Sequence, residues 1–373
     1  MKAMRVPFLE LKRESERHRT ELERAIARVL ARGWYILGPE LEALEQEFAR
    51  YLNVPFAAGV GSGTDALSLA LEASEAVRPG EGDEVVTSVL SAAFSALAIL
   101  RAGAIPRFAD IDPATLQIDP RCIETGFGER TRAILPVHLY GHVCDMRQIG
   151  ELARRHRLIV IEDACQAHGS RLDGNALGTF GFAAGFSFYP TKNLGALGDA
   201  GMVVTSDEGI CLRVKKLRHG GQSRTYYHEL PGCNSRLDEI QAAVLRLRLE
   251  TLEAGNDTRR HMARAYDEAF ADLDLTLLPV RPGLEPNRHL YPVRTRRREE
   301  LRRYLSDHGI ETLVHYPVPL SRQPALSRFV LPGQEFPVAE RAAREIFSLP
   351  LNPELTEAEQ QFTIEIVRRF FQK

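Results

Sequence analysis

The chain has little cysteine and almost no excess charge of either sign. Its 373 residues include five cysteines, and no two of them form a C-x-x-C pair. An odd number of widely spread cysteines argues against a disulfide framework and a zinc ribbon, and it favours a reducing compartment. Lys and Arg number 48 against 50 Asp and Glu, which gives a net charge of -2. No global positive field exists to collect nucleic acid or an anionic membrane, so any bound anion must be held by local geometry.

Long apolar segments are lacking as well. The longest nearly apolar stretch, Val89–Leu100, has about 12 residues and contains two serines, which is too short to cross a bilayer. The amino-terminal residues include many charges and lack the apolar region of a secretory signal. We therefore expect a cytoplasmic protein that binds neither a membrane nor a nucleic acid.

Short β-rich runs alternate with helical segments through the first part of the chain. The expected strands are Glu84–Thr87, Pro106–Ala109, Ala133–Leu139, Leu158–Glu162, Ala184–Phe188 and Met202–Thr205. The expected helices include Glu10–Ala31, Glu40–Tyr51, Asp65–Ser74, Ala92–Arg101 and Met146–His156. This alternation predicts βαβ units and an α/β fold, with a largely parallel sheet covered on both faces.

The pattern changes after Asn234. A helix is expected from Leu237 through Leu249 or beyond, with an interruption at Gly255-Asn256 before a second helical stretch. The segments expected beyond this point are a helix at Arg259–Phe270, a strand at His289–Arg294, a helix at Glu299–His308 and a strand at Glu311–His315. We predict two domains: residues 1–249 as a large α/β domain with a helical amino-terminal segment, and residues 250–373 as a smaller α+β domain.

A glycine-rich stretch, Gly59–Ala66 (GVGSGTDA), follows a short apolar run and opens a helix. Glycines let a ligand approach the backbone, and the exposed amides of a helix start attract an anion, so the stretch predicts phosphate binding, with Ser62 or Thr64 as a hydroxyl donor. From Gly61 it also fits G-x-G-x-x-A, with Asp83 about 20 residues later, and a dinucleotide site is the alternative. A tight turn with a capped helix is the third interpretation.

A second stretch, Val160–His168 (VIEDACQAH), places two carboxylates at the end of a buried strand. Ligands of open α/β sheets gather at the carboxyl ends of the strands. A carboxylate there can bind a metal, a ribose or a protonated ring nitrogen. The alternative is that one of the pair, Glu162 or Asp163, caps the next helix. His168 taken alone is more typical of a structural histidine.

A third stretch, Gly185–Gly201 (GFSFYPTKNLGALGDAG), carries Lys192 in a turn after an aromatic strand. A lysine is usually a solvated surface residue. The aromatic, Ser, Pro and Gly context instead favours a pocket, where burial lowers the pKa of an amine toward that of a nucleophile. Pyridoxal phosphate requires a lysine that forms a Schiff base, an acid beside the pyridine nitrogen and a phosphate cup. The three stretches supply these groups in a consistent order.

The chain resembles the DegT/DnrJ/EryC1/StrS family of sugar aminotransferases, and most closely the branch that acts on 3-keto nucleotide sugars. The resemblance extends from Pro7 to Pro317, and its most specific stretches are GVGSGTDALSLAL, LPVHLYGH, IEDACQAHG, FSFYPTKNLGALGDAG and CNSRLDEIQAAVLR. It implies a type I, aspartate aminotransferase-like fold and a pyridoxal phosphate cofactor that passes through pyridoxamine phosphate, without a metal. The amino group would pass from L-glutamate to C3 of a deoxysugar linked to thymidine or uridine diphosphate, and a 4-keto sugar is the alternative.

The resemblance also implies roles for the residues around the cofactor. Lys192 would form the Schiff base and shuttle the proton, and Asp163 would keep the pyridine nitrogen protonated. Gln166 would contact the phenolic oxygen. The phosphate would be bound by Ser187, Gly63 and Thr64.

A homodimer with shared active sites is implied as well. In this arrangement Asn234 would reach the phosphate of the neighbouring subunit's cofactor. Several residues fall in stretches that border the substrate in the family: Tyr35, His219, Tyr226, His228, His315 and Tyr316.

The chain departs from the family pattern at two positions. Ala92 stands where an aromatic residue usually stacks on the cofactor ring, so either Phe94 is displaced into that role or a smaller contact suffices. Thr225 stands where close relatives often have Lys or Arg, and Arg224 is the alternative source of that charge.

Two further functional classes are carried as alternatives. Some superfamily members were first regarded as regulators, and the intact set of Lys192, Asp163 and Asn234 argues against a non-catalytic role. A nicotinamide-dependent oxidoreductase would explain the glycine-rich stretch but leaves Lys192 and Ser187 without a role. The sugar 3-dehydratase relatives have histidine in place of this lysine.

Overall fold

The largest element of the fold is a seven-stranded sheet. The computed structural model describes residues 4–372. The strands lie in the order β1-β9-β8-β5-β4-β2-β3. Their bounds are β1 (Phe56–Val60), β2 (Glu84–Ser88), β3 (Ile105–Ala109), β4 (Thr131–Leu135), β5 (Ile159–Asp163), β8 (Ala183–Ser187) and β9 (Gly201–Thr205). Strand β9 is antiparallel to both of its neighbours, and the other pairs are parallel, so the predicted mostly parallel α/β sheet is confirmed.

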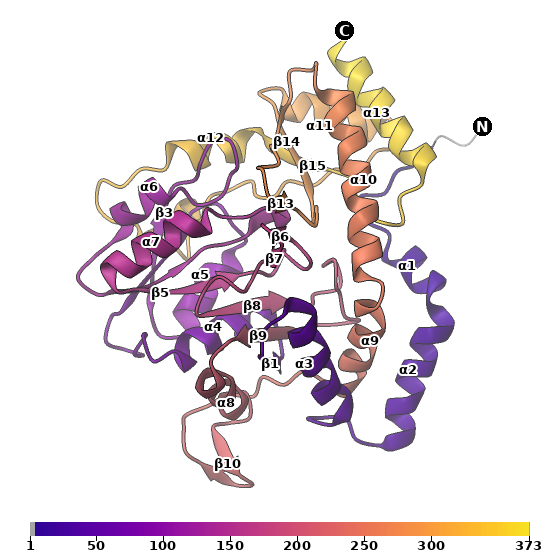
Figure 1. Cartoon of the computed structure of the whole chain (residues 1–373). Coiled ribbons are helices and arrows are strands. Elements are labelled where there is room, and N and C mark those ends of the chain that lie inside the picture. Colours follow the sequence, from indigo (N-terminus) through magenta and orange to yellow (C-terminus); the bar gives the residue numbers. More distant parts are fainter. Residues whose placement is uncertain (1–3, 373) are drawn as a thin grey trace.

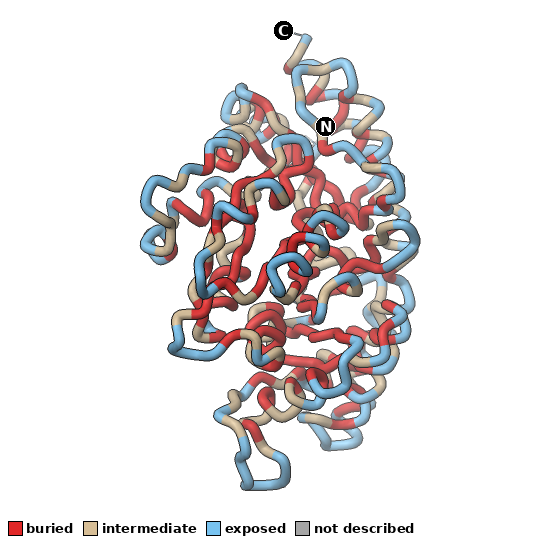
Figure 2. Tube along the Cα trace, turned by 60° about the vertical axis from the view of Figure 1, so that its left-hand side comes forward, coloured by how far each residue is buried: buried red, intermediate tan, exposed pale blue. Residues whose placement is uncertain are grey.

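Helices cover both faces of this sheet. Successive strand residues point to opposite faces, so Val85 packs into one layer of the core and Val86 into the other. One layer contains α4 (Gly63–Ala73), α5 (Ala93–Arg101) and α8 (Glu208–Leu217). The other contains α3 (Pro39–Leu52), α7 (Met146–His156) and α9 (Glu239–Leu249). The strands are therefore buried on both sides, and Figure 2 shows buried chain running through the middle of the molecule.

The carboxyl-terminal part has a core of its own. Helices α9 and α10 (Leu252–Phe270) form a column that leads into it (Figure 1). A three-stranded antiparallel sheet, β12-β14-β15, packs there against α10, α11 and α13. Val6 joins the same core and bridges to Ile310, so the amino-terminal segment returns to this part. The bounds are β12 (Thr276–Leu277), β14 (Tyr291–Arg294), β15 (Ile346–Leu349), α11 (Arg298–Asp307) and α13 (Glu357–Phe371). The domain boundary near residue 250 remains a prediction.

A buried carboxylate joins the start of α3 to α9. The side chain of Glu239 accepts hydrogen bonds from the backbone N–H groups of Gly38, Glu40 and Leu41, at 3.0, 2.9 and 2.8 Å. The first amides of a helix lack intrahelical acceptors, and a negative charge there also interacts favourably with the helix dipole. Glu239 thus caps a helix some 200 positions away and fixes the segment before it.

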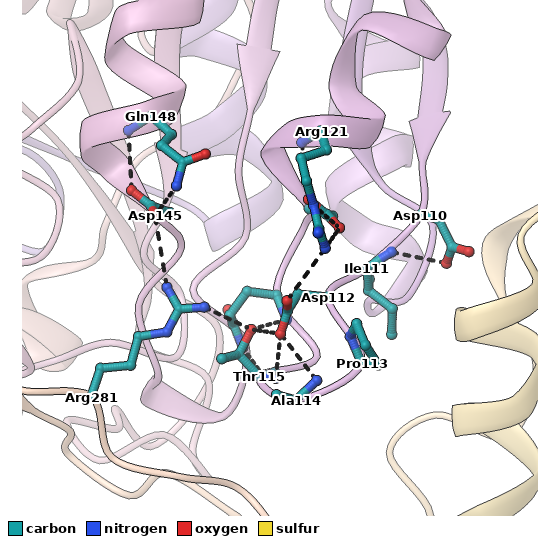
Figure 3. A network of polar contacts seen from close by, with 12 residues as sticks. Asp110, Ile111, Asp112, Pro113, Ala114, Thr115, Arg121, Asp145, Gln148 and Arg281 are labelled. Atoms are coloured by element: carbon teal, nitrogen blue, oxygen red, sulfur yellow. Dashed lines mark hydrogen bonds and ion pairs between the residues drawn. The ribbon is translucent and has the colours of Figure 1, made fainter.

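Arg281 contacts two loops of the large sheet. Its guanidinium lies 3.5 Å from Thr115 Oγ1 and 4.0 Å from Asp145, the residue that caps α7 (Figure 3).

The remaining elements of the fold are α1 (Leu11–Arg17), α2 (Arg19–Arg32), α6 (Pro120–Ile123), η1 (Glu124–Gly126), η2 (Leu139–Gly141), β6 (Arg171–Leu172), β7 (Asn175–Ala176), β10 (Gln222–Arg224), β11 (Tyr227–His228), β13 (Leu284–Glu285), η3 (Leu320–Arg322), η4 (Ser327–Phe329) and α12 (Pro337–Glu345).

Three local predictions were wrong. The amino-terminal helix is divided at His18 into α1 and α2. Gly255 lies inside α10, where a glycine costs only about 1 kcal/mol, and the break falls at residues 250–251 instead. The expected strand Glu311–His315 pairs only at Leu313, which exchanges two backbone hydrogen bonds with Ser348. Within residues 4–372, none of the helices is long and apolar enough to span a membrane.

Candidate active site

A large cavity opens at the carboxyl edge of the sheet. Its volume is about 1660 Å³. Strands β1, β5 and β8 run in one direction, so the residues that follow Val60, Ile161 and Phe186 meet at the same edge. Most of the expected cofactor and substrate residues line this cavity: Gly63, Thr64, Asp163, Gln166, Ser187, Lys192, His315 and Tyr316.

One end of the cavity is a cup of hydrogen-bond donors. Gly63 and Thr64 form the first turn of α4, whose amides lack intrahelical acceptors, and Ser62 caps the helix by accepting from Asp65 N at 3.1 Å. The end of β8 is pressed against this turn, because a Cβ added to Gly63 would lie 2.5 Å from Ser187 Cβ. The cup therefore combines backbone N–H groups, the helix dipole and two hydroxyls, which suits a phosphate.

A carboxylate without a cationic partner lies deeper in the cavity. Asp163 ends β5 and is 5% exposed. One carboxylate oxygen accepts from Ser95 Oγ at 2.7 Å and the other from Cys165 N at 3.1 Å. No Lys, Arg or His of the described residues pairs with it within 4.0 Å. A buried charge of this kind requires a positive group, and a protonated ring nitrogen supplies one.

The amine of Lys192 also lacks a partner among residues 4–372. Its backbone N–H donates to Tyr189 O at 2.8 Å, which fixes the turn after β8, while the side chain lines the cavity. Burial lowers the pKa of Lys192, although Cys165 and Asp163 act in the opposite direction. The site thus favours a neutral, nucleophilic amine.

Three histidines near Lys192 are held neutral. Burial, followed by the charge of Lys192, lowers the pKa of His168 to about 3 and that of His315 to about 4. The same two causes place the pKa of His289 well below its usual range, with Arg259 as a further cause. His289 Nδ1 lies 3.0 Å from Asn193 Oδ1, next to Lys192 in sequence. These rings therefore add no positive charge to the surroundings of Lys192.

Gln166 connects the loop after β5 to the carboxyl-terminal part. Its Oε1 accepts from Tyr140 N at 2.7 Å, and its Nε2 lies 3.3 Å from the Tyr316 hydroxyl. The Tyr140 hydroxyl in turn donates to His315 O at 2.6 Å. Burial raises the pKa of Tyr316 to about 12, so its hydroxyl stays protonated at neutral pH. Residues 315–316 are thereby fixed over the cavity.

The remaining predicted residues do not line this chain's own cavity. His219, Tyr226, His228 and Asn234 lie in or beside the exposed hairpin β10-β11, at the lower end of the molecule in Figure 1, and we call them the hairpin group. Asn234 forms a bridge with His219, and Tyr226 is 90% exposed. Tyr35 lies apart from them, before α3, where its carbonyl accepts from Glu239 N at 3.0 Å.

Several lining residues were not predicted from the sequence. Ser95 and Arg259 lie in helices without a motif, and no sequence signal singled them out. Arg302 and Arg303 belong to a basic run that is typical of a solvated surface, yet both line the outer part of the cavity. Ala92 lines it too, and Phe94 is 63% exposed at its edge.

The dinucleotide alternative does not fit the structure. Asp83 lies before the first residue of β2, at the opposite edge of the sheet from the glycine-rich turn. It is buried, accepts from Arg78 N at 3.0 Å and pairs with Arg132 at 3.1 Å. It is therefore not available to a ribose beside Gly61.

The residues present fit pyridoxal phosphate. The donor cup suits the phosphate, Asp163 suits the ring nitrogen, and the unpaired amine of Lys192 suits the aldehyde. A metal ion has no comparable site: within residues 4–372, no group of three or more His, Cys, Asp or Glu side chains is placed to hold one.

Comparison with known proteins finds aminotransferases that are similar to this chain over nearly its whole length. The family model described as the DegT/DnrJ/EryC1/StrS aminotransferase family matches residues 16–368. The dTDP-3-amino-3,4,6-trideoxy-α-D-glucose transaminase of Streptomyces venezuelae is 46% identical, over 99% of this chain and 97% of that protein. The crystal structure of S. venezuelae DesV has a TM-score of 0.95 at 46% identity, covering 99% of both chains. NtdA of Bacillus subtilis, solved with pyridoxamine phosphate as bound cofactor, has a TM-score of 0.92 at 30% identity, covering 99% of this chain and 86% of that one.

Proposed function

The chain belongs to the DegT/DnrJ/EryC1/StrS aminotransferase family, and we propose that it moves an amino group from L-glutamate to C3 of a nucleoside-diphosphate-linked keto sugar. It is a pyridoxal phosphate-dependent sugar aminotransferase with the type I fold. One observation carries the proposal furthest: Lys192 and Asp163, an amine and a carboxylate without ionic partners among residues 4–372, line the same cavity as a phosphate cup.

Each group in the cavity has a separate task. When bound, pyridoxal phosphate supplies an electron sink that lets the Cα–H bond of an amino acid break, and it stores the amino group between the two substrates. Gly63, Thr64 and Ser187 bind the phosphate. Asp163, held in place by Ser95 Oγ and Cys165 N, keeps the ring nitrogen protonated. Lys192 Nζ would take the proton from Cα of the donor and pass it to the bound cofactor, and in the second half of the reaction it would carry a proton the other way, to the sugar carbon that receives the amino group.

We assign C3 and a thymidine diphosphate carrier as the preferred acceptor. The support is the 46% identity to a transaminase whose name specifies a dTDP-linked 3-amino sugar. A nucleoside diphosphate also suits the outer part of the cavity, where Arg303 has no ionic partner among the described residues. A 4-keto sugar and a uridine diphosphate carrier are the alternatives that the substrate screen below distinguishes.

We further propose a cytoplasmic homodimer in which the hairpin group completes the partner's active site. Asn234 and Tyr226 are exposed and lie outside the chain's own cavity, although they resemble cofactor- and substrate-binding positions of the family. Contribution of these side chains to a second copy would account for both facts. The five cysteines are free thiols, which suits a reducing compartment.

One variant and one substrate screen test the assignment. Lys192→Ala should lose the lysine-linked cofactor absorbance and all turnover, because no other described amine lines the phosphate cup. The wild-type pyridoxamine form is screened against 3-keto and 4-keto nucleotide sugars. An active Lys192→Ala protein, or a wild type that aminates none of these sugars, contradicts the proposed function.

Mixing tests the shared site. Heterodimers of Lys192→Ala and Asn234→Ala protein contain one site with both wild-type residues if Asn234 acts on the partner's cofactor. Partial recovery of activity is expected. Verified heterodimers without activity contradict a shared interface.

A further inference from the structure

A second, smaller cavity adjoins the active-site cavity at Lys192. Its volume is about 310 Å³. The residues that line both cavities are Leu9, Thr191, Lys192 and Arg259. Arg259 therefore lies at the junction of the two cavities, and the reaction described above gives it no role.

Arg259 is a buried cation that contacts only neutral groups. It lies on α10 and is 5% exposed. Its Nη1 donates to Leu351 O at 2.8 Å, with His289 O and Arg288 O at 3.3 and 3.5 Å. No Asp or Glu of residues 4–372 lies within 4.0 Å of its guanidinium, and its Nε and Nη2 atoms have no acceptor in that part of the chain. Most of its hydrogen-bonding capacity is unused.

The other arginines of the second cavity have carboxylate partners. Arg17 pairs with Glu354 at 2.9 Å, and Arg248 pairs with Glu14 at 3.2 Å. Burial lowers the pKa of Arg259 to about 10, and Glu14 opposes this only in part. Arg259 therefore remains positively charged at neutral pH. A buried, unpaired charge is costly, and an anionic ligand would remove that cost.

We propose that Arg259 binds the α-carboxylate of the amino donor. The inference rests on the proposed aminotransferase function and adds the residue that recognises the first substrate. In an amino acid the α-carboxylate is bonded to the carbon whose proton Lys192 removes, so its anchor must lie beside Lys192. Arg259 lines the junction of the two cavities together with Lys192, which makes it the candidate for this anchor.

The other cations of the active-site cavity fit this role less well. Arg101 pairs with Asp65 at 2.6 Å, and Arg302 lies 3.6 Å from Glu299. Arg303 is unpaired among the described residues but is exposed on α11. The sugar ring separates the diphosphate of the acceptor from its ketone, so an outer, exposed arginine suits the acceptor and an inner, buried one suits the donor. His289 and His315 are held neutral and supply no charge.

The test separates the two half-reactions in the holoenzyme. Arg259→Gln should reduce the kcat/KM of the donor half-reaction about 10- to 100-fold, which is typical for loss of a charge-assisted hydrogen-bonded pair. The half-reaction of the pyridoxamine form with the keto sugar should be unchanged. Arg259→Lys keeps the charge and should recover part of the loss. Arg264→Gln, an exposed arginine on the same helix, is the matched control and should resemble the wild type.

A binding measurement gives a readout independent of turnover. Succinate should raise the Tm of the wild-type holoenzyme and of the Arg264→Gln variant, and Arg259→Gln should lose this shift. L-glutamate and L-glutamine share the α-carboxylate, so the loss in the donor half-reaction should be similar for both.

Three results would overturn the inference. They are an equal loss in both half-reactions, a succinate shift that survives in Arg259→Gln, and a loss confined to L-glutamate, which would assign Arg259 to the distal carboxylate. If Arg259→Gln does not fold, the same comparison with Arg259→Lys decides, since a structural role predicts equal effects on both half-reactions. Failure of the proposed function is distinguishable, because then the wild type itself would transfer no amino group.

Discussion

Replacing Gly63 by alanine should damage the phosphate cup more than it damages the fold. The added Cβ would lie 2.5 Å from Ser187 Cβ and 2.9 Å from Cys165 Sγ. Carbon atoms in contact prefer about 3.5–4.0 Å, so the start of α4 and the end of β8 must separate by roughly 1 Å. These two segments form the cup, and the separation should stretch its hydrogen bonds to the phosphate.

The expected magnitude follows from two contributions. Overpacking of this kind costs about 1–3 kcal/mol. A donor moved by 1 Å leaves the range of about 2.7–3.2 Å in which N–H···O bonds are strong. Losing one charge-assisted hydrogen bond costs about 1.5–3 kcal/mol, which corresponds to a Kd for pyridoxal phosphate raised about 10- to 100-fold.

Two other helical glycines provide matched controls. A Cβ on Gly150, in α7, would meet nothing within 4 Å, and one on Gly255, in α10, would meet Pro353 Cγ at 3.7 Å. Alanine at Gly150 should stabilise the protein by about 0.5–1 kcal/mol, and neither control should change cofactor affinity. The assays are titration of the cofactor-free protein with pyridoxal phosphate and urea unfolding of the same preparations. A wild-type Kd in Gly63→Ala would refute the cup as the phosphate site.

Two further predictions concern stability. Glu239→Gln should lower the free energy of unfolding by about 2–4 kcal/mol, because one of the oxygens that accept from the start of α3 becomes a donor. The control is Glu250→Gln, an exposed residue at the end of α9. A loss below about 1 kcal/mol in Glu239→Gln would contradict the capping role. Burial opposes protonation of His138, but Cys144 and Glu162 raise its pKa from 6.5 to about 10. The stabilisation that protonated His138 gives the folded state should be complete below pH 6.5 and lost as the pH rises toward 10. The free energy of unfolding of the wild type should therefore fall more steeply over this window than that of His138→Gln. Parallel curves for the two proteins would contradict this role of His138.

The sequence predicts the large sheet and the nearness of the candidate cofactor residues to one another, because both follow from local patterns. The apolar run Leu158–Ile161 leads to a buried strand, and β5 (Ile159–Asp163) begins and ends within one residue of the expected strand Leu158–Glu162. Once parallel strands are predicted, their carboxyl ends must share an edge. The proximity of Gly63, Asp163 and Ser187 then follows without any knowledge of side-chain contacts.

The carboxyl-terminal part was less predictable because its elements are fixed by tertiary contacts. Strand β15 and helices α12 and α13 were not predicted at all. β15 is an edge strand of the small sheet and pairs with β14. Ser348 of β15 also pairs with Leu313, which lies in the segment that the sequence pattern predicts as a full strand. A short apolar run of this kind becomes a strand only where another strand offers its hydrogen-bonding edge.

The residues that the sequence could not assign are those whose chemistry depends on burial. Arg259 and Arg303 are both helical arginines, and the sequence alone does not distinguish them. In the structure Arg259 is buried and lines the cavity of Lys192, whereas Arg303 is exposed on α11. Burial removes water from Arg259 without supplying a carboxylate, so its charge must be satisfied by a ligand. The same enclosure keeps His289 and His315 neutral. A near-neutral protein can thus concentrate its affinity for anions at a few enclosed positions, and the separate half-reactions of Arg259→Gln measure whether the innermost of these recognises the donor.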